Sequence, residues 1–350
     1  MPEIARFTAY LHFNSIATST RACYFNAKKS WWDFVASTTP GSLPSYPPLP
    51  STGIALWLGW LACKNKASSI RTYMFGLHKW HMELGMESPI QGNNFVWATW
   101  RGIKRFQGQI AAETGNKPAK REPITAGVLA LIQTQLDLNK LYDATIWAAF
   151  TMGTFALLRL GEFTVPDTYG RRAQPEEFEA IVLRWRHIEW YDELGNRTVM
   201  RGGRFQKLPR EYRLLLPASK TDPFRQSVTI RVFAPMAVQA LSNLAELRGA
   251  NIKFNDPLFM DPAANNGPFS REQLLGALGT ALENCGLNPD DYNGHSFRRG
   301  GAQTLAEAGI SEDVIQIMGR WLSDAYKVYI NTPYEVIKAA SLAMEPEPKC

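Results

Sequence analysis

The chain has 350 residues, of which 45% are hydrophobic and 20% charged, a composition typical of globular proteins and not of disordered ones. This length favours two domains, each able to bury its own core. The longest uncharged apolar run, residues 144–158, is too short for a bilayer span of about 20 residues, so we expect a core helix there and no membrane contact.

The first residues lack the basic start and apolar stretch of a signal peptide, so we expect an intracellular protein, nuclear if its source is eukaryotic. The four cysteines stand far apart without a CxxC pair, which predicts reduced thiols, no metal site and no cofactor. His78 and His81 stand three residues apart, a spacing that could suit a metal. No further ligand lies near them in the sequence, so packing or solvation is the favoured interpretation.

The positive charge of the chain is concentrated at its N-terminal end. The net charge is +6, yet residues 1–121 hold 14 Lys and Arg against 5 Asp and Glu, whereas the remainder hold 24 against 27. Because each neutralised phosphate releases counterions whatever the base sequence, a basic N-terminal third suits a nucleic-acid partner. Lysines and arginines that only solvate helix faces are the alternative.

This basic third is predicted to form a helical bundle over residues 1–110, with the tryptophans in its core. Residues 39–51 are rich in proline, which predicts an extended loop, and residues 111–123 are polar, basic and proline-bearing, which predicts an interdomain linker. Helical spacing of apolar residues, caps and glycine stops predict helices over 18–37, 53–64, 67–84 and 93–109.

Lysines and arginines recur on these helices and on the linker among Trp and Tyr residues, as a surface that lies along phosphates requires. The candidate DNA contacts are Lys28, Lys29, Lys64, Lys66, Arg71, Arg101, Lys104, Arg105, Lys120 and Arg121. Which of them touch base edges cannot be predicted from sequence.

Two helices, 129–136 and 144–158, are predicted to open the second part of the chain. The second leads into Leu-Leu-Arg-Leu-Gly-Glu-Phe, which sets Arg159 and Glu162 three residues apart. A surface pair at this spacing contributes only about 0.2–0.5 kcal/mol. An arginine directly after an uncharged apolar helix is not typical of a solvated face, so Arg159 is a candidate site residue.

A β-rich insert follows, and the turn at 218–223 between its last two strands carries Lys220. Another lysine of the insert, Lys207, is the alternative to it. Beyond the insert, residues 233–249 predict an amphipathic helix, and Ser270 with Gln273 predicts a capping box in front of a leucine-rich core helix. Alternation of apolar and polar residues predicts the strands at 179–191, 212–217 and 227–232.

The last informative stretch is HSFRRGGAQTLAEAGISEDVIQIMGRWLSDAYKVY, which runs from His295 to Tyr329. It begins with His-x-x-Arg, in which the arginine is Arg298, and places Trp321 eight residues before Tyr329. A tyrosine has a free pKa near 10, so one that acts as a nucleophile needs neighbouring cations that favour its phenolate. The stretch supplies several cations.

Taken together, an Arg with an acid three residues later, a Lys on a β turn, His-x-x-Arg and a C-terminal Tyr resemble the tyrosine recombinase, or phage-integrase, family. The wording HSFR, AEAG, GRW-SDAY and YI is most similar to recombinases of Crypton and DIRS-type mobile elements. The resemblance implies a mainly helical α+β chain that closes on DNA as a C-shaped clamp. Its catalytic domain, with a small antiparallel sheet, would span 124–332.

The resemblance also assigns roles around one phosphate. Arg159 and Arg298 would hold its non-bridging oxygens with paired, permanently charged hydrogen bonds, and Glu162 would hold Arg159 in place. His295 would contact the same phosphate and help to manage the tyrosine proton. Lys220 would protonate the leaving 5′-oxygen.

Tyr329 would be the nucleophile, with Tyr326 and Tyr334 as competitors. The family places a His or Trp directly after a glycine and nine residues before the nucleophile, and here that slot holds Arg320. Either Arg320 is a further phosphate donor, or a shift of one residue lets Trp321 donate its indole N–H. Arg299 is expected to serve the DNA backbone or a salt bridge.

The resulting hypothesis is a site-specific DNA recombinase that cleaves and rejoins double-stranded DNA through a 3′-phosphotyrosyl intermediate, without metal or ATP, for a mobile element. The family acts as a homotetramer on two DNA sites, and the tail over 333–350 would either enter a neighbouring protomer or fold back. The alternatives are an inactive DNA-binding relic and a DNA-relaxing enzyme similar to type IB topoisomerases.

Overall fold

The computed structural model describes residues 2–13, 15–115, 121–166, 182–217, 227–261 and 267–328. The chain divides into two compact units, Met1–Pro118 and Ala119–Cys350, and the division falls within the stretch that we expected to be a linker. No helix in these ranges is long and apolar enough to cross a membrane.

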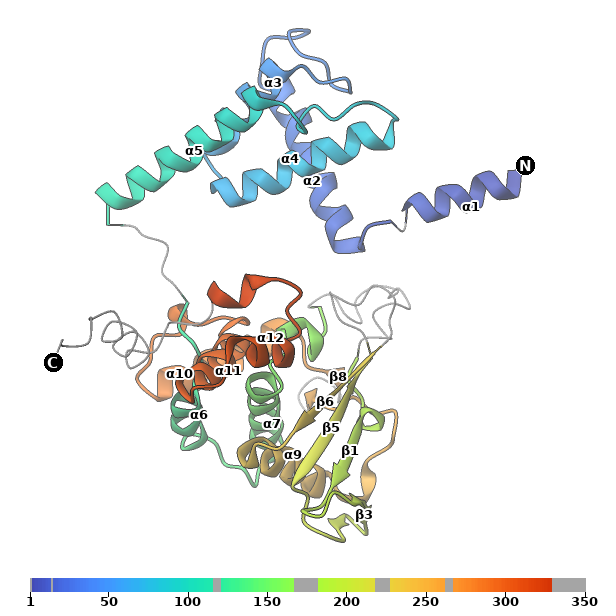
Figure 1. Ribbon diagram of the computed structural model, residues 1–350, viewed down its shortest axis with the longest axis vertical. Coiled ribbons are helices and arrows are strands. Elements are labelled where there is room, and N and C mark those ends of the chain that lie inside the picture. Colours follow the sequence, from blue (N-terminus) through green and yellow to red (C-terminus); the bar gives the residue numbers. More distant parts are fainter. Residues whose placement is uncertain are drawn as a thin grey trace, which may run out of the picture. The chain divides into compact units, whose positions relative to one another are not determined.

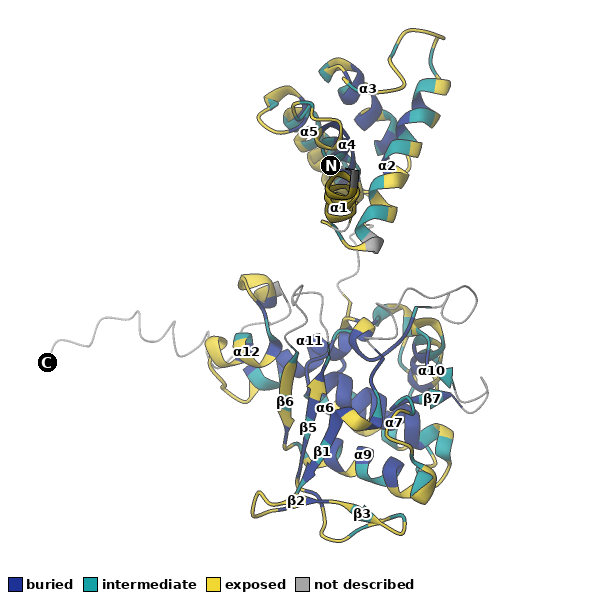
Figure 2. Ribbon diagram, turned by 90° about the vertical axis from the view of Figure 1, so that its right-hand side faces the viewer, coloured by how far each residue is buried: buried dark blue, intermediate teal, exposed yellow. Residues whose placement is uncertain are grey.

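The N-terminal unit is helical throughout its regular structure (Figure 1). Its predicted helices are confirmed to within a few residues, whereas the first helix was not predicted, and Figure 2 shows that helix exposed along its length. The helices are α1 (Pro2–Phe13), α2 (Thr18–Ala36), α3 (Ser51–Ala62), α4 (Ala67–Glu83) and α5 (Asn94–Glu113).

Tryptophans form the core of this unit, as predicted. Trp31 and Trp57 are fully buried, and their ring centroids lie 6.0 Å apart. His81 is also buried: its Nδ1 donates to the carbonyl of Leu77 over 2.8 Å, and its Nε2 accepts from the N–H of Leu49 over 3.0 Å. Burial lowers the pKa of His81. Both ring nitrogens are thus occupied, which confirms the interpretation of a packed histidine.

The C-terminal unit is mainly helical with a small antiparallel sheet, which confirms the predicted α+β class. Its central helix, α7, is buried at every position from Ala144 to Thr154 and appears dark blue in Figure 2. Buried side chains of α7, α9 and the sheet, among them Phe150, Leu241 and Tyr212, join in one core. The helices are α6 (Ala126–Gln133), α7 (Leu141–Phe155), α9 (Pro235–Arg248), α10 (Arg271–Asn284), α11 (Ser296–Glu307) and α12 (Glu312–Gly319).

The sheet has the strand order β2-β1-β5-β6, with antiparallel neighbours. Its longest pair, β5 with β6, aligns Leu214 with Ile230. The strands are β1 (Ile188–Tyr191), β2 (Arg197–Thr198), β5 (Glu211–Leu216) and β6 (Val228–Val232). Two further ribbons pair β3 (Met200–Arg201) with β4 (Arg204–Phe205) and β7 (Met260–Asp261) with β8 (Gly267–Pro268).

The predicted strands at 212–217 and 227–232 are confirmed, but the strand at 179–191 is wrong for its described N-terminal part. Only residues 188–191 are extended as a strand, and a 3-10 turn, η2 (Trp185–His187), precedes them. Both ends of that turn, Trp185 and His187, are buried, so apolar and polar residues alternate there for a reason other than strand geometry.

Two glycines let α11 lie directly against the backbone of its neighbours. A Cβ atom at Gly301 would overlap the carbonyl of Thr154 in α7, and one at Gly300 would overlap the carbonyl of Ile124. The sequence Arg-Arg-Gly-Gly is therefore explained by packing, because the close approach sets Arg298 against the end of α7.

Gly301→Ala is expected to destabilise the chain by about 1–3 kcal/mol, since α11 must move away from α7 to admit the methyl group. Urea unfolding of the full chain measures this change. Gly276→Ala is the matched control, because Gly276 is exposed on α10 with open space around it; alanine there should stabilise by about 0.5–1 kcal/mol. Equal effects of the two substitutions would contradict the close-packing argument.

His187, the last residue of η2, gives the unit a pH dependence. Burial, with smaller effects of Arg186 and Arg184, lowers the pKa of His187 to about 4. The folded state therefore keeps the ring neutral, whereas the unfolded chain takes up a proton below its ordinary pKa of about 6.5. Stability from this group is full above that value and is lost as the pH falls towards about 4.

Between pH 7 and pH 4.5, wild type should therefore lose about 1–2 kcal/mol more stability than His187→Gln, after allowance for solvent screening. Urea midpoints of both proteins at the two pH values measure the difference. An equal loss in the two proteins would show that other groups cause all of the acid destabilisation.

Candidate active site

The helix α7 ends in a left-handed turn that would ordinarily favour glycine. The N–H of Leu158 donates to the carbonyl of Gly153 over 3.0 Å, the N–H of Leu157 donates to that of Thr154 over 3.2 Å, and Leu157 has a φ of 49°. The side chain of Leu157 lies in a buried cluster with Ala302, Ile315 and Tyr326, and this burial offsets the backbone strain. The turn leaves the carbonyls of Ala156 and Leu157 as acceptors for Arg298 and Arg320.

The helix α12 ends in the same way, with Arg320 in the left-handed position at a φ of 56°. The N–H of Trp321 donates to the carbonyl of Gln316 over 3.1 Å, and the N–H of Arg320 donates to that of Ile317 over 3.0 Å. A residue other than glycine pays roughly 1–2 kcal/mol for this conformation. Contacts of the Arg320 side chain are therefore needed to offset that cost.

Glu162 holds two of the arginines with one carboxylate. Its Oε1 lies 2.8 Å from Arg159 Nη1, and its Oε2 lies 3.1 Å from Arg320 Nη2 and accepts from the backbone N–H of Arg159 over 2.9 Å. Glu162 is only 6% exposed. A buried carboxylate needs compensating charge, so this is a structural ion cluster and not a surface pair.

Arg298 is the most enclosed of the arginines, with 1% of its surface exposed. It donates from Nη1 to the carbonyl of Leu157 over 3.0 Å and from Nη2 to the carbonyl of Gly319. Its Cζ lies 4.2 Å from the ring centroid of Trp321. A Cβ at Gly319 would overlap that ring, so the glycine makes room for the indole under the guanidinium.

Arg320 faces inward with four donors occupied. Its Nη1 donates to the carbonyls of Ala156 over 3.2 Å and Met318 over 3.4 Å, and its Nη2 donates to Leu157 over 3.1 Å and to Glu162 over 3.1 Å. Burial lowers the pKa of Arg320, and the charge of Glu162 opposes that shift. The structure thus brings Arg159, Arg298 and Arg320 together around the end of α7.

His295 is also among the predicted site residues that the structure describes. It is exposed at the start of α11, one turn before Arg298, and its N–H donates to Asn293 Oδ1 over 2.8 Å. The described chain ends one residue before the predicted nucleophile. Lys120, Lys220, Tyr329, Tyr334 and the tail over 333–350 lie outside the described residues.

The competitors for the tyrosine and lysine roles are engaged elsewhere. Tyr326 is 2% exposed; its ring packs on Trp321 at 5.8 Å, and its hydroxyl donates to Glu312 over 3.1 Å. Burial and that hydrogen bond raise the pKa of Tyr326. Lys207 is paired with Asp192 at 3.1 Å. Tyr326 therefore acts as a packing residue in this arrangement, because a raised pKa opposes formation of a phenolate.

Arg299 lies beside Arg298 in the sequence but has a different partner. It is 7% exposed, and its Nη1 donates to the backbone carbonyl of Arg121 over 2.6 Å. It therefore fixes the end of the linker segment to α11, and the expected role of Arg299 at the DNA backbone or in a salt bridge stays a prediction. Arg121 itself has an exposed side chain.

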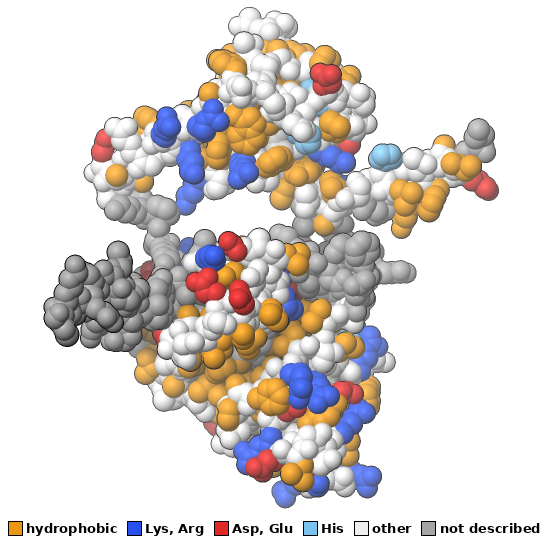
Figure 3. Space-filling view, viewed as in Figure 1, with side chains coloured by type: hydrophobic (Ala, Val, Ile, Leu, Met, Phe, Trp, Pro, Cys, Tyr) orange, Lys and Arg blue, Asp and Glu red, His pale blue; other side chains and the backbone are white. Residues whose placement is uncertain are grey.

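Figure 3 shows lysine and arginine side chains gathered over α4 and α5 of the N-terminal unit. Arg71 and Lys104 each lie 5.8 Å from the ring centroid of Trp100. A hollow of about 400 Å³ beside them is lined by Trp100, Arg101, Lys104 and Arg105. Cations that converge on an aromatic face form a positively charged surface of the kind that phosphates bind.

The other predicted contacts of this unit differ among themselves. Lys29 and Lys64 line a second hollow of about 280 Å³, and Lys66 is exposed at the start of α4. Lys28, in contrast, is paired with Glu83 at 3.0 Å and is partly neutralised by it. The positive surface is therefore carried by the other lysines and arginines.

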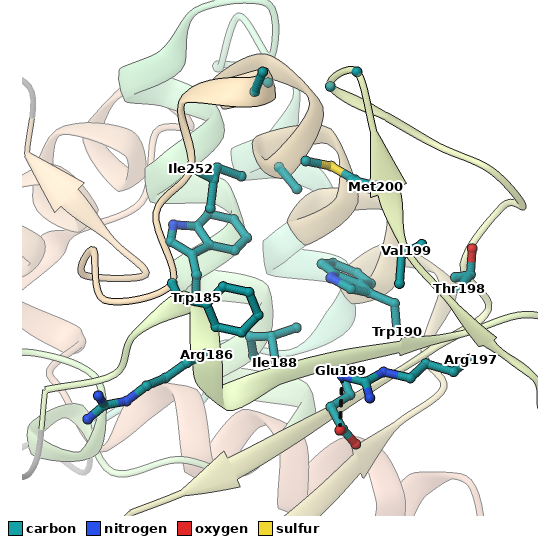
Figure 4. A pocket seen from close by; sticks show the side chains of 16 residues that line it. Trp185, Arg186, Ile188, Glu189, Trp190, Arg197, Thr198, Val199, Met200 and Ile252 are labelled. Carbon is teal, nitrogen blue, oxygen red and sulfur yellow. Dashed lines mark ion pairs between the residues drawn. The ribbon is translucent and has the colours of Figure 1, made fainter.

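A separate cavity of about 440 Å³ lies in the C-terminal unit between the sheet, the β3–β4 ribbon and the end of α9. Trp185, Trp190, Met200 and Ile252 point into it, and an ion pair of Glu189 with Arg197 lies at its edge (Figure 4). It shares no residue with the arginine cluster. In the part of the chain that the structure describes, no group of three His, Cys, Asp or Glu side chains could hold a metal ion.

Sequence reasoning missed the acceptors on which this cluster depends. The carbonyls of Ala156 and Leu157 carry no side-chain signal, and the tie from Arg320 to Glu162 joins positions 158 residues apart. One signal in the sequence could have indicated these contacts: Leu157 and Arg320 stand at helix ends where glycine is common, so their side chains must make contacts that glycine could not.

Trp321→Ala is expected to destabilise the C-terminal unit by about 3–5 kcal/mol, because it removes the buried ring between Arg298 and Tyr326. Trp321→Phe should cost less, since it keeps part of the ring. Urea unfolding measures both changes. Phe254→Ala is the control: Phe254 is 76% exposed, so its loss should change stability by less than about 0.5 kcal/mol. A Trp321→Ala effect no larger than the control would contradict the packing role.

No family model and no curated protein matches the sequence. Solved structures do match. XerH site-specific recombinase in a post-cleavage complex with palindromic difH is 12% identical over 93% of this chain and 80% of that one, with a TM-score of 0.57. A lambda integrase dimer bound to a COC′ core site is 16% identical over 99% and 97%, at 0.55.

The integrase of transposon Tn1549 in complex with transposon right-end DNA is 11% identical over 97% of this chain and 98% of that one, with a TM-score of 0.52. These likenesses cover both units of the chain. The closer similarity to Crypton and DIRS-type recombinases stays a prediction. By its structure, the chain has the fold of the tyrosine recombinases and integrases.

Proposed function

We propose that this chain is a site-specific DNA recombinase that cuts and rejoins DNA strands through Tyr329. The observation that carries the proposal is the convergence of Arg159, Arg298 and Arg320 at the end of α7. The fold adds support, since XerH, lambda integrase and the Tn1549 integrase were each solved with DNA.

The charge of the cluster suits a phosphate. Three guanidinium groups and the carboxylate of Glu162 leave two positive charges in a site that is largely closed to water. A phosphodiester carries one negative charge, and its five-coordinate transition state carries two. Preorganised cations that face this growing charge lower the barrier more than they stabilise the ground state.

In the proposed first step, the phenolate oxygen of Tyr329 attacks the scissile phosphorus. A bond forms between that oxygen and phosphorus, and the bond from phosphorus to the 5′-oxygen breaks. His295 helps to take the tyrosine proton, and Lys220 gives a proton to the departing oxygen, which leaves as a 5′-hydroxyl. The 3′-phosphotyrosyl bond keeps the energy of the phosphodiester, so a second 5′-hydroxyl can attack it without ATP.

The sheet supports the choice of Lys220 over Lys207. In the sequence, Lys207 comes before β5 and Lys220 comes after it, and the six residues of β5 set its two ends about 20 Å apart. Figures 1 and 2 place the β2 and β3 end of the sheet far from α11 and α12. The opposite end of the sheet lies nearer to α11 and α12.

The N-terminal unit would hold the DNA backbone. Its positive surface over α4 and α5, with Arg71 and Lys104 on Trp100, is the observation behind this assignment. We further propose that four protomers act on two DNA sites, with the tail over 333–350 as a link between them or folded back on its own unit. Integration or excision of a mobile element, inside the cell, is the proposed biological use.

A nicked duplex carrying candidate element ends tests the reaction, because release of a short 5′-hydroxyl strand traps the covalent complex. Wild type should form a protein–DNA adduct that resists denaturant, and Tyr329→Phe should abolish it. Tyr326→Phe is the matched control. It removes only the hydroxyl that donates to Glu312, so it should retain cleavage within about threefold of wild type.

An adduct that survives Tyr329→Phe but disappears in Tyr326→Phe would show that Tyr326, and not Tyr329, is the nucleophile. Binding of DNA with no adduct in any protein would instead identify a DNA-binding relic. Relaxation of any supercoiled plasmid by a monomer would indicate an enzyme of the topoisomerase type.

A further inference from the structure

We infer that Arg320 is a positioning residue which fixes the orientation of Glu162, and through it of Arg159, without touching the phosphate itself. Arg320 stands directly after Gly319, in the slot where the family resemblance implies a phosphate contact. The inference rests on the proposed function, and it argues against the alternative in which Arg320 is a further phosphate donor.

The donors of Arg320 are already committed. A guanidinium has five N–H groups. Four of them go to the carbonyls of Ala156, Leu157 and Met318 and to Glu162 Oε2. The fifth, on Nε, is buried and has no hydrogen-bond partner within the residues that the structure describes. A phosphate could therefore bind Arg320 only after these hydrogen bonds had broken.

Arg159 presents the opposite picture. Its side chain is 22% exposed, and its guanidinium makes one hydrogen bond, from Nη1 to Glu162 Oε1. Across the described ranges, its remaining N–H groups have no partner. Arg159 is therefore the member of the pair that can offer a paired contact to a phosphate.

The backbone supports a side-chain purpose for Arg320. Its φ of 56° lies in the left-handed region, where glycine or asparagine would sit with less strain. The contacts of its guanidinium with α7 and Glu162 offset that strain and join the end of α12 to the end of α7. Arg320 is thus kept in a strained backbone conformation because its side chain holds Glu162 in place. We call this contact the brace on Glu162.

Loss of this brace has a definite electrostatic consequence. Without Arg320, both oxygens of Glu162 would be left to Arg159, its other ion-pair partner. The carboxylate would then neutralise the guanidinium that is needed for the phosphate, and would be free to turn it away. If Glu162 were replaced by Gln, that excess negative charge would not arise.

The test is a double-mutant cycle on the full chain, with the rate of adduct formation on nicked DNA as the readout. Arg320→Met should slow cleavage by about 10- to 100-fold, the usual effect of removing a residue that orients a site group. In a Glu162→Gln background, the same substitution should slow cleavage by less than about threefold, because its target is gone. Arg320→Lys should restore part of the rate.

Binding separates a positioning role from a phosphate contact. Affinity for the nicked site should change by less than about threefold in Arg320→Met, and the slope of log affinity against log salt should stay the same, whereas a lost phosphate contact lowers that slope by about one. Arg248→Met is the matched control: Arg248 is a half-buried arginine outside the cluster that donates to the carbonyl of Met260, and its loss should leave cleavage unchanged.

Equal penalties of Arg320→Met in both backgrounds, or a reduced salt slope, would overturn the inference. Thermal melting checks that each variant folds, and Arg320→Lys replaces Arg320→Met in the cycle if the latter does not. If wild type forms no adduct, the proposed function fails. If wild type cleaves and the penalties are additive, only the positioning role fails.

Discussion

The candidate site depends on one backbone carbonyl, that of Leu157. Arg298 donates to it over 3.0 Å and Arg320 over 3.1 Å, so two guanidinium groups from different helices meet at one atom. The left-handed turn at Leu157 directs that carbonyl towards them, and burial of the leucine side chain holds the turn. Guanidinium groups this close to one another repel. The negative end of the α7 dipole and the carboxylate of Glu162 offset that repulsion.

The sequence predicted the parts of the fold that local pattern controls. Helix caps, glycine stops and period-two alternation located most of the helices of both units and strands β5 and β6, because these signals lie within a few residues of the element. They did not reveal η2, the short ribbons, α1 or α12. Trp185 and His187 are both buried in a 3-10 turn, which mimics the spacing of a strand, and α1 has no core contact to pattern it.

The site was predicted as a set of residue types, and the structure adds how they are joined. Arg159 with Glu162 followed from adjacency to an apolar helix, and Arg298 followed from its motif. Helix geometry predicted that Arg299 would have another role than Arg298, but its partner, a backbone carbonyl 178 residues away, could not be predicted from the sequence. Arg299 turns to the carbonyl of Arg121, because the successive residues of a helix point about 100° apart.

The enclosure of Arg298 bears on when the proposed cleavage of DNA could occur. With 1% of its surface exposed and Trp321 beneath it, this guanidinium cannot meet a phosphodiester that merely drifts past. On the proposed function, the side chains that enclose it would have to move before a phosphodiester could reach it. On the proposed function, the resting molecule is latent: its cutting power is released by recognition, so chance encounters with the genome leave no breaks.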